Sequence, residues 1–253
     1  STRWQFEQFK PMKRLQTRIA SVALRNYLRS SRLRQGNFVV SGYPKSGTTW
    51  VTQLVARLAG LTYRPGNVRF RLKGVALHTH GTAFEGADNI LYSVRDPRES
   101  VCSAARAMHA RRFAGVYDAQ GQITDEFAIF AMTELPGAKQ RMRDHLQTGL
   151  DSGWAFLRFE DLKWDPKVKL AELVTKFDWS ATERQIDEAI STFDFSLQRE
   201  RNTGNAFFAQ STVASWTGLL SPAVLDLLEA EVGPTAQAFG YDLSQRPTTR
   251  QEG

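Results

Sequence analysis

The chain has 253 residues and a mass of 28.5 kDa, and 42% of its residues are hydrophobic and 23% charged. This composition is ordinary for a globular protein with a sizeable core. The sequence contains no run of about 18 apolar residues, so we expect no membrane span. The single cysteine, Cys102, excludes an internal disulfide and a cysteine metal cluster, so we expect a cytoplasmic protein.

The positive charge lies at the amino-terminal end of the chain. The net charge is +7, and residues 1–35 carry nine basic side chains and one acidic one, which leaves 24 basic and 25 acidic side chains, or −1, for the rest. Within this basic arm, residues 11–29 place apolar side chains at three- and four-residue steps, which predicts an amphipathic helix. Two interpretations remain open: the helix packs on the domain, or it contacts a membrane surface, helped by Trp4, Phe6 and Phe9. No nucleic-acid recognition motif accompanies the charge, so we expect no nucleic-acid partner.

Strands and helices alternate after the arm. Short apolar, β-branched runs predict buried strands at 37–41, 74–78, 89–94 and 154–159. Helices are predicted at 48–60, 97–112, 166–177 and 222–240. This order is typical of a single α/β domain, residues 36–243, with a central, mostly parallel sheet flanked by helices. Residues 244–253 form a polar tail.

The stretch SGYPKSGTTW, residues 41–50, joins the first predicted strand to the first predicted helix. The spacing of Gly42 and Gly47 is P-loop-like, and a strand–loop–helix unit offers an anion the free N–H groups of a helix N-terminus. A standard loop has lysine directly after the second glycine, whereas here threonine stands there and Lys45 lies inside the loop. His78-Thr79-His80 and Arg95-Asp96-Pro97-Arg98 also follow predicted strands. Because ligands of parallel sheets bind at the carboxyl ends of the strands, we expect all three stretches at one site.

Three motifs together resemble one enzyme family. SGYPKSGTTW, LYSVRDPRESVCS (91–103) and RFEDL (158–162) resemble the cytosolic-type sulfotransferases that use 3′-phosphoadenosine 5′-phosphosulfate (PAPS), and the similarity runs from about residue 37 to 240. The resemblance implies that the protein moves a sulfuryl group from PAPS, as co-substrate, to a hydroxyl acceptor. The product of the donor would be 3′-phosphoadenosine 5′-phosphate (PAP), and no metal would take part.

The resemblance also assigns roles to individual residues. The 5′-phosphosulfate would be held by Lys45, Ser46, Gly47, Thr48 and Thr49, and the 3′-phosphate by Arg95 and Ser103. Trp50 matches a tryptophan that packs near the adenine, and Phe159 stands where the family often has tyrosine. The triplet at 78–80 occupies the place of a K-T-H triplet, so His80 is the expected catalytic base and His78 replaces a lysine. His78 either assists the transferring sulfuryl group or orients the loop.

The chemistry of the donor agrees with the displaced lysine. A lysine inside the loop can lie beside the oxygen that bridges phosphorus and sulfur, where negative charge develops as the S–O bond breaks. Threonine hydroxyls and backbone N–H groups can bind the 5′-phosphate without metal. The strand at 89–94 is followed by Arg95 and not by an acidic residue. An arginine there can bind a 3′-phosphate bidentately. An imidazole of ordinary pKa suits His80 for taking the acceptor proton.

One motif of the family is altered. Residues 208–216 have the spacing of its F-R-K-G-x-x-G-D-W loop, which closes over the nucleotide, but Ala209, Gln210 and Ser211 replace arginine, lysine and glycine. Two cationic contacts are missing, each typically worth roughly 1.5–3 kcal/mol. Either Arg199 or Arg201 compensates, or the donor binds more weakly.

The acceptor pocket is expected from the loops 61–73, 106–122 and 204–213. Their surroundings supply aromatic side chains suited to a lipid-like or aromatic alcohol, or to the core: Tyr63, Phe70, Phe84, Phe113, Tyr117, Phe127, Phe207 and Phe208. The basic arm favours a lipid-like acceptor slightly.

Two other functions remain open. A kinase or NTPase with a degenerate P-loop would turn over ATP with Mg²⁺, although threonine at position 48 and the RDPR motif argue against it. A non-catalytic protein that binds membranes or anions through the arm would agree with the altered 208–216 loop, although the intact Lys45 and His80 argue against it.

Overall fold

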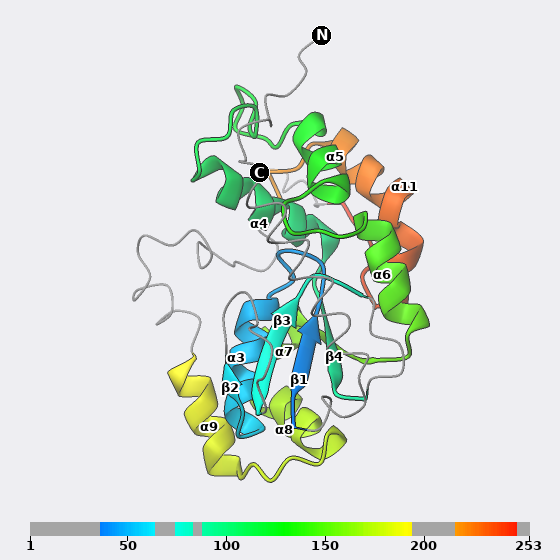
Figure 1. Ribbon diagram of the computed structural model, residues 1–253. Coiled ribbons are helices and arrows are strands. Elements are labelled where there is room, and N and C mark those ends of the chain that lie inside the picture. Colours follow the sequence, from blue (N-terminus) through cyan, green and yellow to red (C-terminus); the bar gives the residue numbers. More distant parts are fainter. Residues whose placement is uncertain (1–35, 64–73, 83–87, 194–215, 247–253) are drawn as a thin grey trace, which may run out of the picture.

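Five parallel strands form the central sheet (Figure 1), in the computed structural model of the protein, which describes residues 36–63, 74–82, 88–193 and 216–246. The strands are β1 (Phe38–Ser41), β2 (Thr62–Tyr63), β3 (Val75–Thr79), β4 (Ile90–Val94) and β5 (Ala155–Arg158), in the order β2-β3-β1-β4-β5. Ser41, at the end of β1, is paired with Thr79 of β3 and Tyr92 of β4. The carboxyl ends of the three inner strands therefore meet at one edge, with β1 between strands reached in opposite directions along the chain.

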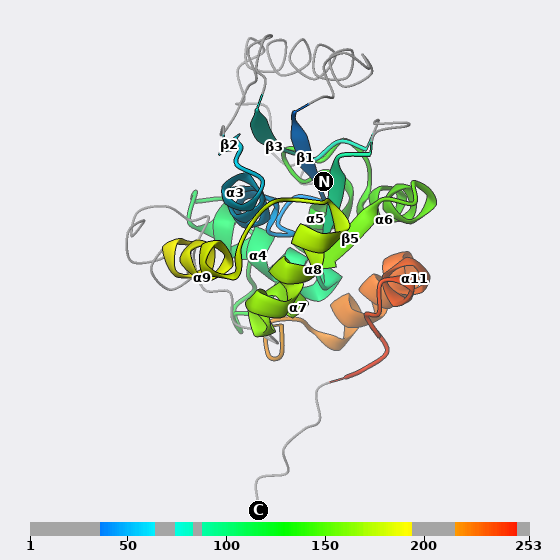
Figure 2. The same cartoon turned by 90° about the horizontal axis from the view of Figure 1, so that it is seen from below.

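Helices cover both faces of the sheet and lie beyond its carboxyl edge (Figures 1 and 2). The described helices are α3 (Thr48–Leu58), α4 (Pro97–His109), α5 (Asp125–Thr133), α6 (Met142–Asp151), α7 (Phe159–Trp164), α8 (Pro166–Lys176), α9 (Glu183–Thr192) and α11 (Pro222–Ala238). In Figure 1, α4 and α5 lie past the arrowhead of β1, whereas α3, α8 and α9 lie beside and below the sheet.

The core has two parts, one on each face of the sheet. One part joins α4, α5, α6 and α11 to β4 through the wholly buried Tyr92. The other joins α3, α7, α8 and α9 to β1, whose Phe38 and Val40 both face it. Successive residues of β4 divide between the two parts, as the alternation of side chains along a strand requires. Burial on both faces explains why the inner strands read as continuous apolar runs.

The predicted fold class is confirmed. Each of the four predicted strands is present, with its ends moved by no more than one residue, and the sheet is wholly parallel over its described strands. Four predicted helices are present but end one to three residues early; α4 ends at His109 because Arg112, with a φ of 61°, takes the chain out of helical geometry. The pattern did not reveal β2, which has only two residues, or the helices α5, α6, α7 and α9.

The roles of the two ends of the chain stay predictions. The arm, residues 1–35, and most of the tail, residues 247–253, lie outside the described part of the chain. Within the described part, no helix has the length and apolar character needed to span a membrane.

Candidate active site

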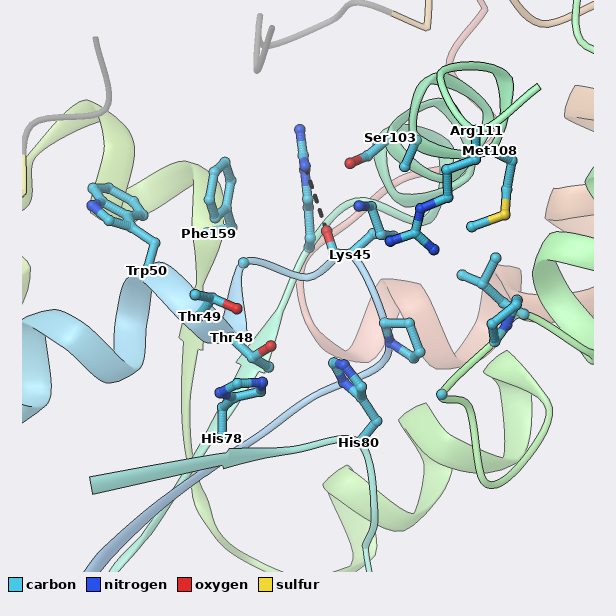
Figure 3. A pocket seen from close by; sticks show the side chains of 17 residues that line it. Lys45, Thr48, Thr49, Trp50, His78, His80, Ser103, Met108, Arg111 and Phe159 are labelled. Atoms are coloured by element: carbon cyan, nitrogen blue, oxygen red, sulfur yellow. Dashed lines mark hydrogen bonds between the residues drawn. The ribbon is translucent and has the colours of Figure 1, made fainter. Parts of the chain in front are cut away.

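A cavity of about 310 Å³ lies at the carboxyl edge of β1, β3 and β4 (Figure 3). Ten of the eleven residues predicted for the site line this cavity: Lys45, Gly47, Thr48, Thr49, Trp50, His78, His80, Arg95, Ser103 and Phe159. They come from the loop after β1, the start of α3, the end of β3, the end of β4, α4 and α7. Sequence-distant motifs thus converge on one site, as the parallel topology led us to expect.

The loop between β1 and α3 has a strained, tightly packed backbone. Lys45 has a φ of 77° and Gly47, the N-cap of α3, a φ of 84°. A positive φ is costly for a residue with a side chain, and such outliers cluster where the surrounding structure holds a functional conformation. Gly42 has no room for a side chain, because a Cβ there would lie 2.4 Å from the Ser93 carbonyl oxygen. The close approach fixes the loop against β4.

Ser46 is the predicted site residue that does not line this cavity. Its side chain is buried and lines a smaller cavity beneath the loop together with Tyr43 and Ser93. Its backbone holds the loop, since its N–H donates to the Tyr43 carbonyl over 3.1 Å and its carbonyl accepts from the Ser93 hydroxyl over 2.7 Å. The structure therefore gives Ser46 a place in the loop's internal bonding.

Lys45 is the cation at the centre of the site. Burial lowers the pKa of its ammonium group to about 8, and the positive charges of Arg111, Arg95 and Arg106 lower it further in that order of influence. The group is therefore still mostly protonated at neutral pH. An anion bound beside it would relieve both the desolvation and the repulsion between like charges.

His80 is held in one tautomer by the loop itself. Its Nδ1 lies 2.9 Å from the carbonyl oxygen of Gly42, and because a carbonyl only accepts, Nδ1 carries the hydrogen and donates it. Nε2 then carries a lone pair. Burial lowers the pKa of this imidazole to about 4, because its effect is larger than that of the Gly42 hydrogen bond, which raises the pKa. This value is below the ordinary pKa expected of the base, and His80 is neutral at neutral pH. A neutral imidazole with a free Nε2 is a proton acceptor.

His78 lies beside His80 on the same strand end, with 6.1 Å between the ring centroids. Burial lowers its pKa as well, so the ring is neutral at neutral pH. Its Nδ1 is buried and has no hydrogen-bond partner among the described residues. Tyr63, at the end of β2, stacks near its ring at 6.4 Å between centroids.

Arg95 is buried at the end of β4 and is compensated by two carboxylates. Its Nη2 lies 3.2 Å from Glu99 and its Nε lies 4.0 Å from Glu160. Its Nη1 donates to the carbonyl of Lys45 over 3.4 Å, which ties the loop to the neighbouring strand (Figure 3). The guanidinium carbon lies 4.5 Å from the centroid of the Phe159 ring, which covers it.

Trp50 and Phe159 form an aromatic wall at one end of the cavity. Their ring centroids lie 5.5 Å apart in an edge-on arrangement. The indole N–H of Trp50 donates to the Phe193 carbonyl over 2.7 Å, which fixes the ring. A Cβ on Gly47 would lie 2.4 Å from the Phe159 ring, so this glycine lets the aromatic wall approach the loop. The arrangement suits a flat, apolar ring such as a nucleobase.

Six further residues line the opposite end of the cavity, and three of them fall in the segment 106–122, which the sequence placed around the acceptor. Here the cavity is lined by Ala107, Met108, Arg111, Leu135, Pro136 and Gly137. Ala107 and Met108 lie on α4, and Arg111 follows the end of that helix at His109. The segment 135–137 lies outside every segment that the sequence assigned to the site. Gly137 packs against the His80 ring, since a Cβ there would lie 3.4 Å from its Cδ2.

The aromatic residues expected around the acceptor divide into two groups. Of those described, none lines this cavity: Phe127 is in the core, Phe113 and Tyr117 pack against the core, and Tyr63 stacks near His78. Phe70, Phe84, Phe207 and Phe208 lie outside the described residues, as do Ala209, Gln210, Ser211, Arg199 and Arg201.

Trp216, which ends the altered loop, is described and anchors to the same region. Its backbone N–H donates to the carboxylate of Glu99 over 3.3 Å. The centroid of its ring lies 4.3 Å from the guanidinium carbon of Arg98. Glu99 thus contacts both Arg95 and the end of the 208–216 segment. In the described part of the chain, no three His, Cys, Asp or Glu side chains gather into a group that could hold a metal ion.

Comparison with known proteins identifies the fold. No protein-family model matches the sequence, and no curated protein matches it. Among solved structures, mouse sulfotransferase SULT7A1 complexed with PAP matches with a TM-score of 0.61 and 15% identity, over 81% of this chain and 89% of that one. Retinol dehydratase in complex with androsterone and inactive cofactor PAP matches with a TM-score of 0.58 and 15% identity, over 84% of this chain and 83% of that one. The chain has the sulfotransferase fold.

Proposed function

We propose that the protein is a sulfotransferase that moves the sulfuryl group of PAPS to a hydroxyl acceptor. The observation that carries the proposal is the convergence of Lys45, His80 and the Arg95–Ser103 pair on one cavity. The resemblance of the motifs and the fold shared with two PAP-bound structures support it independently. PAPS would be the co-substrate and PAP the product.

The residues of the cavity fit the donor from one end to the other. Trp50 and Phe159 offer a slot for the adenine, and the N-terminus of α3 offers Thr48 and Thr49 with their N–H groups for the 5′-phosphate. Ser103 stands on α4 within the same cavity as Arg95 and provides a hydroxyl for the 3′-phosphate. Lys45, between the helix N-terminus and His80, supplies the charge for the phosphosulfate (Figure 3).

The transfer uses two residues directly. The acceptor oxygen bonds to sulfur while the bond from sulfur to the bridging oxygen breaks, and the electron pair stays on that oxygen, which becomes part of PAP. Lys45 stabilises the negative charge that develops there. The Nε2 atom of His80 takes the proton of the acceptor hydroxyl. The negative donor raises the pKa of His80 from its low value, which strengthens the base only when the donor is bound.

The end of the cavity opposite the aromatic wall is mostly apolar. Met108, Leu135 and Pro136 line it, which suits the body of a lipid-like or aromatic alcohol. Contact of the basic arm with a membrane would bring the protein to a lipid-like acceptor, and this contact is part of the proposal. A cytoplasmic location, expected from the single cysteine, is also part of the proposal.

A titration with three nucleotides tests the class. PAP, 5′-AMP and ATP with Mg²⁺ are compared by calorimetry, and we expect PAP to bind at least about tenfold more tightly than 5′-AMP, because only PAP carries a 3′-phosphate. Ser103→Ala should weaken PAP binding and leave 5′-AMP binding unchanged. Tighter binding of ATP with Mg²⁺ than of PAP would favour the kinase or NTPase alternative. Binding of none of the three would favour a non-catalytic role.

A further inference from the structure

Arg111 is a charged residue of the cavity to which neither the motifs nor the proposed donor contacts assign a role. It follows the end of α4 and lines the cavity on the side opposite the aromatic wall. Figure 3 shows its side chain reaching inward toward Lys45, from the same side as Met108. Its charge also has the largest influence of any neighbouring charge on the Lys45 ammonium group.

The charge of Arg111 is not matched by the protein. Arg111 is exposed and forms no ion pair or side-chain hydrogen bond with any residue that the structure describes. Arg95, by contrast, is buried and faces Glu99 and Glu160. Two cations that face one another across a cavity repel, and an anion between them removes the repulsion. The pair Lys45–Arg111 therefore defines a place for negative charge.

The position of the Lys45–Arg111 pair in the cavity indicates which anionic group of the donor lies between the two side chains. If the adenine lies at Trp50 and the 5′-phosphate at the N-terminus of α3, the sulfuryl group extends toward His80 and away from the aromatic wall. Arg111 reaches the cavity from that far side (Figure 3). The two histidines at the end of β3 are neutral at neutral pH and supply no positive charge to the sulfuryl oxygens.

We propose that the guanidinium of Arg111 binds the non-bridging oxygens of the sulfuryl group, opposite Lys45, and so acts as a further catalytic residue. The inference rests on the proposed function. Two parallel N–H donors of a guanidinium match two oxygens of a sulfonate-like group, and the contact persists as the group passes from the donor to the acceptor. Arg111 thus distinguishes PAPS from PAP, whereas Arg95 and Ser103 treat the two alike.

Equilibrium binding of PAP and PAPS to the full chain tests the inference without an acceptor. Three variants are compared with the unaltered protein: Arg111→Gln, Arg111→Lys and, as a matched control, Arg112→Gln. Arg112 is the next residue, is exposed and does not line the cavity, so the control removes the same charge one position away. The affinity for PAP reports the intact nucleotide site of each variant, and the ratio of the two affinities reports the sulfuryl contact.

We expect Arg111→Gln to weaken PAPS binding about tenfold and to leave PAP binding unchanged, because a charge-assisted pair of hydrogen bonds to the sulfuryl group is lost. Arg111→Lys should retain part of the effect, and Arg112→Gln should match the unaltered protein. An unchanged ratio of PAPS to PAP affinity in Arg111→Gln would overturn the inference. Two unchanged affinities would then place Arg111 at the acceptor, and equal weakening of both would place it at a phosphate that PAP and PAPS share. If Arg112→Gln weakened PAPS binding as much as Arg111→Gln does, the inference would also be overturned, because the effect would then be one of general charge. Failure of the unaltered protein to bind PAP would overturn the proposed function, and this inference with it.

Discussion

Lys45 shows how a single residue combines an unusual backbone with an unusual charge. Its backbone has a φ of 77°, its side chain lines the cavity, and burial lowers the pKa of its ammonium group to about 8. A pKa lowered from the usual 10.5 means that the charge is present below pH 8 and is lost as the pH rises through that value. The binding of an anionic nucleotide should follow the same course.

The pH dependence of PAP affinity tests the charge of Lys45. Between pH 7.5 and 9.5 we expect the Kd of the unaltered protein for PAP to rise about tenfold, because the ammonium group must be protonated to attract the phosphate. Lys45→Arg should show a flat profile, since an arginine remains charged throughout this range. The thiol of Cys102, one residue before Ser103, does not interfere, because burial raises its pKa to about 12. An equal slope in the two proteins would contradict the assignment.

The sequence predicted the residues of the cavity correctly where they lie in a recognisable motif. Lys45, His80 and Arg95 lie in short, recognisable motifs, and each lines the cavity. Arg111 lies beyond the end of α4 and in no motif, so the sequence placed it only within the segment 106–122 expected around the acceptor. Leu135 and Pro136 had no signal at all, because the fold brings them to the cavity from a segment outside every motif.

At the scale of elements, the junction of β1 with α3 carries most of the proposed chemistry. Gly47 begins α3 with a φ of 84°, and Gly60 follows its end with a φ of 65°. Both conformations favour glycine. A Cβ on Gly47 would lie 2.4 Å from the Phe159 ring, whereas nothing lies within 4 Å of one on Gly60.

Replacing each glycine with alanine separates backbone strain from the packing of the site. Both Gly47→Ala and Gly60→Ala should lose about 1–2 kcal/mol of unfolding free energy from the left-handed backbone. Only Gly47→Ala should also displace the Phe159 ring and lower the affinity for PAP at least about tenfold, because the aromatic wall and the loop then no longer meet. Thermal unfolding and PAP titration of both variants provide the measurement. Loss of PAP affinity in Gly60→Ala would show that strain alone accounts for the effect.

Strands with a clear apolar pattern and the longer helices were predicted, whereas the shorter helices and β2 were not. The inner strands β1 and β4 are buried on both faces and show continuous apolar runs, so their ends could be placed closely. β2 is too short to show any pattern. The start of α9 carries a capping box, Thr182 with Gln185, which is a local sequence signature of a helix start.

At the scale of the whole molecule, charge is divided between the arm and the rest. The arm has a net charge of +8, from nine basic residues and one acidic one, whereas the other residues together carry −1. The cations of the cavity, Lys45, Arg95 and Arg111, all belong to the nearly neutral remainder. Binding of anionic surfaces and binding of the nucleotide should therefore be separable in the full chain.

Neutralising part of the arm tests this separation and distinguishes the two interpretations of the arm. The full chain with four glutamine substitutions, at Lys10, Lys13, Arg14 and Arg18, is compared with the unaltered protein by co-sedimentation with vesicles that contain anionic lipid. If the arm binds membranes, each basic residue near the surface contributes about 1 kcal/mol, so the variant should lose most of its vesicle binding. Added salt should release the unaltered protein, and vesicles of zwitterionic lipid should retain less of it. Affinity for PAP should stay unchanged in the variant, because the substitutions leave the cavity cations in place. If the unaltered protein stays in the supernatant, the membrane interpretation is wrong, and the arm's packing on the domain becomes the remaining explanation of its apolar face.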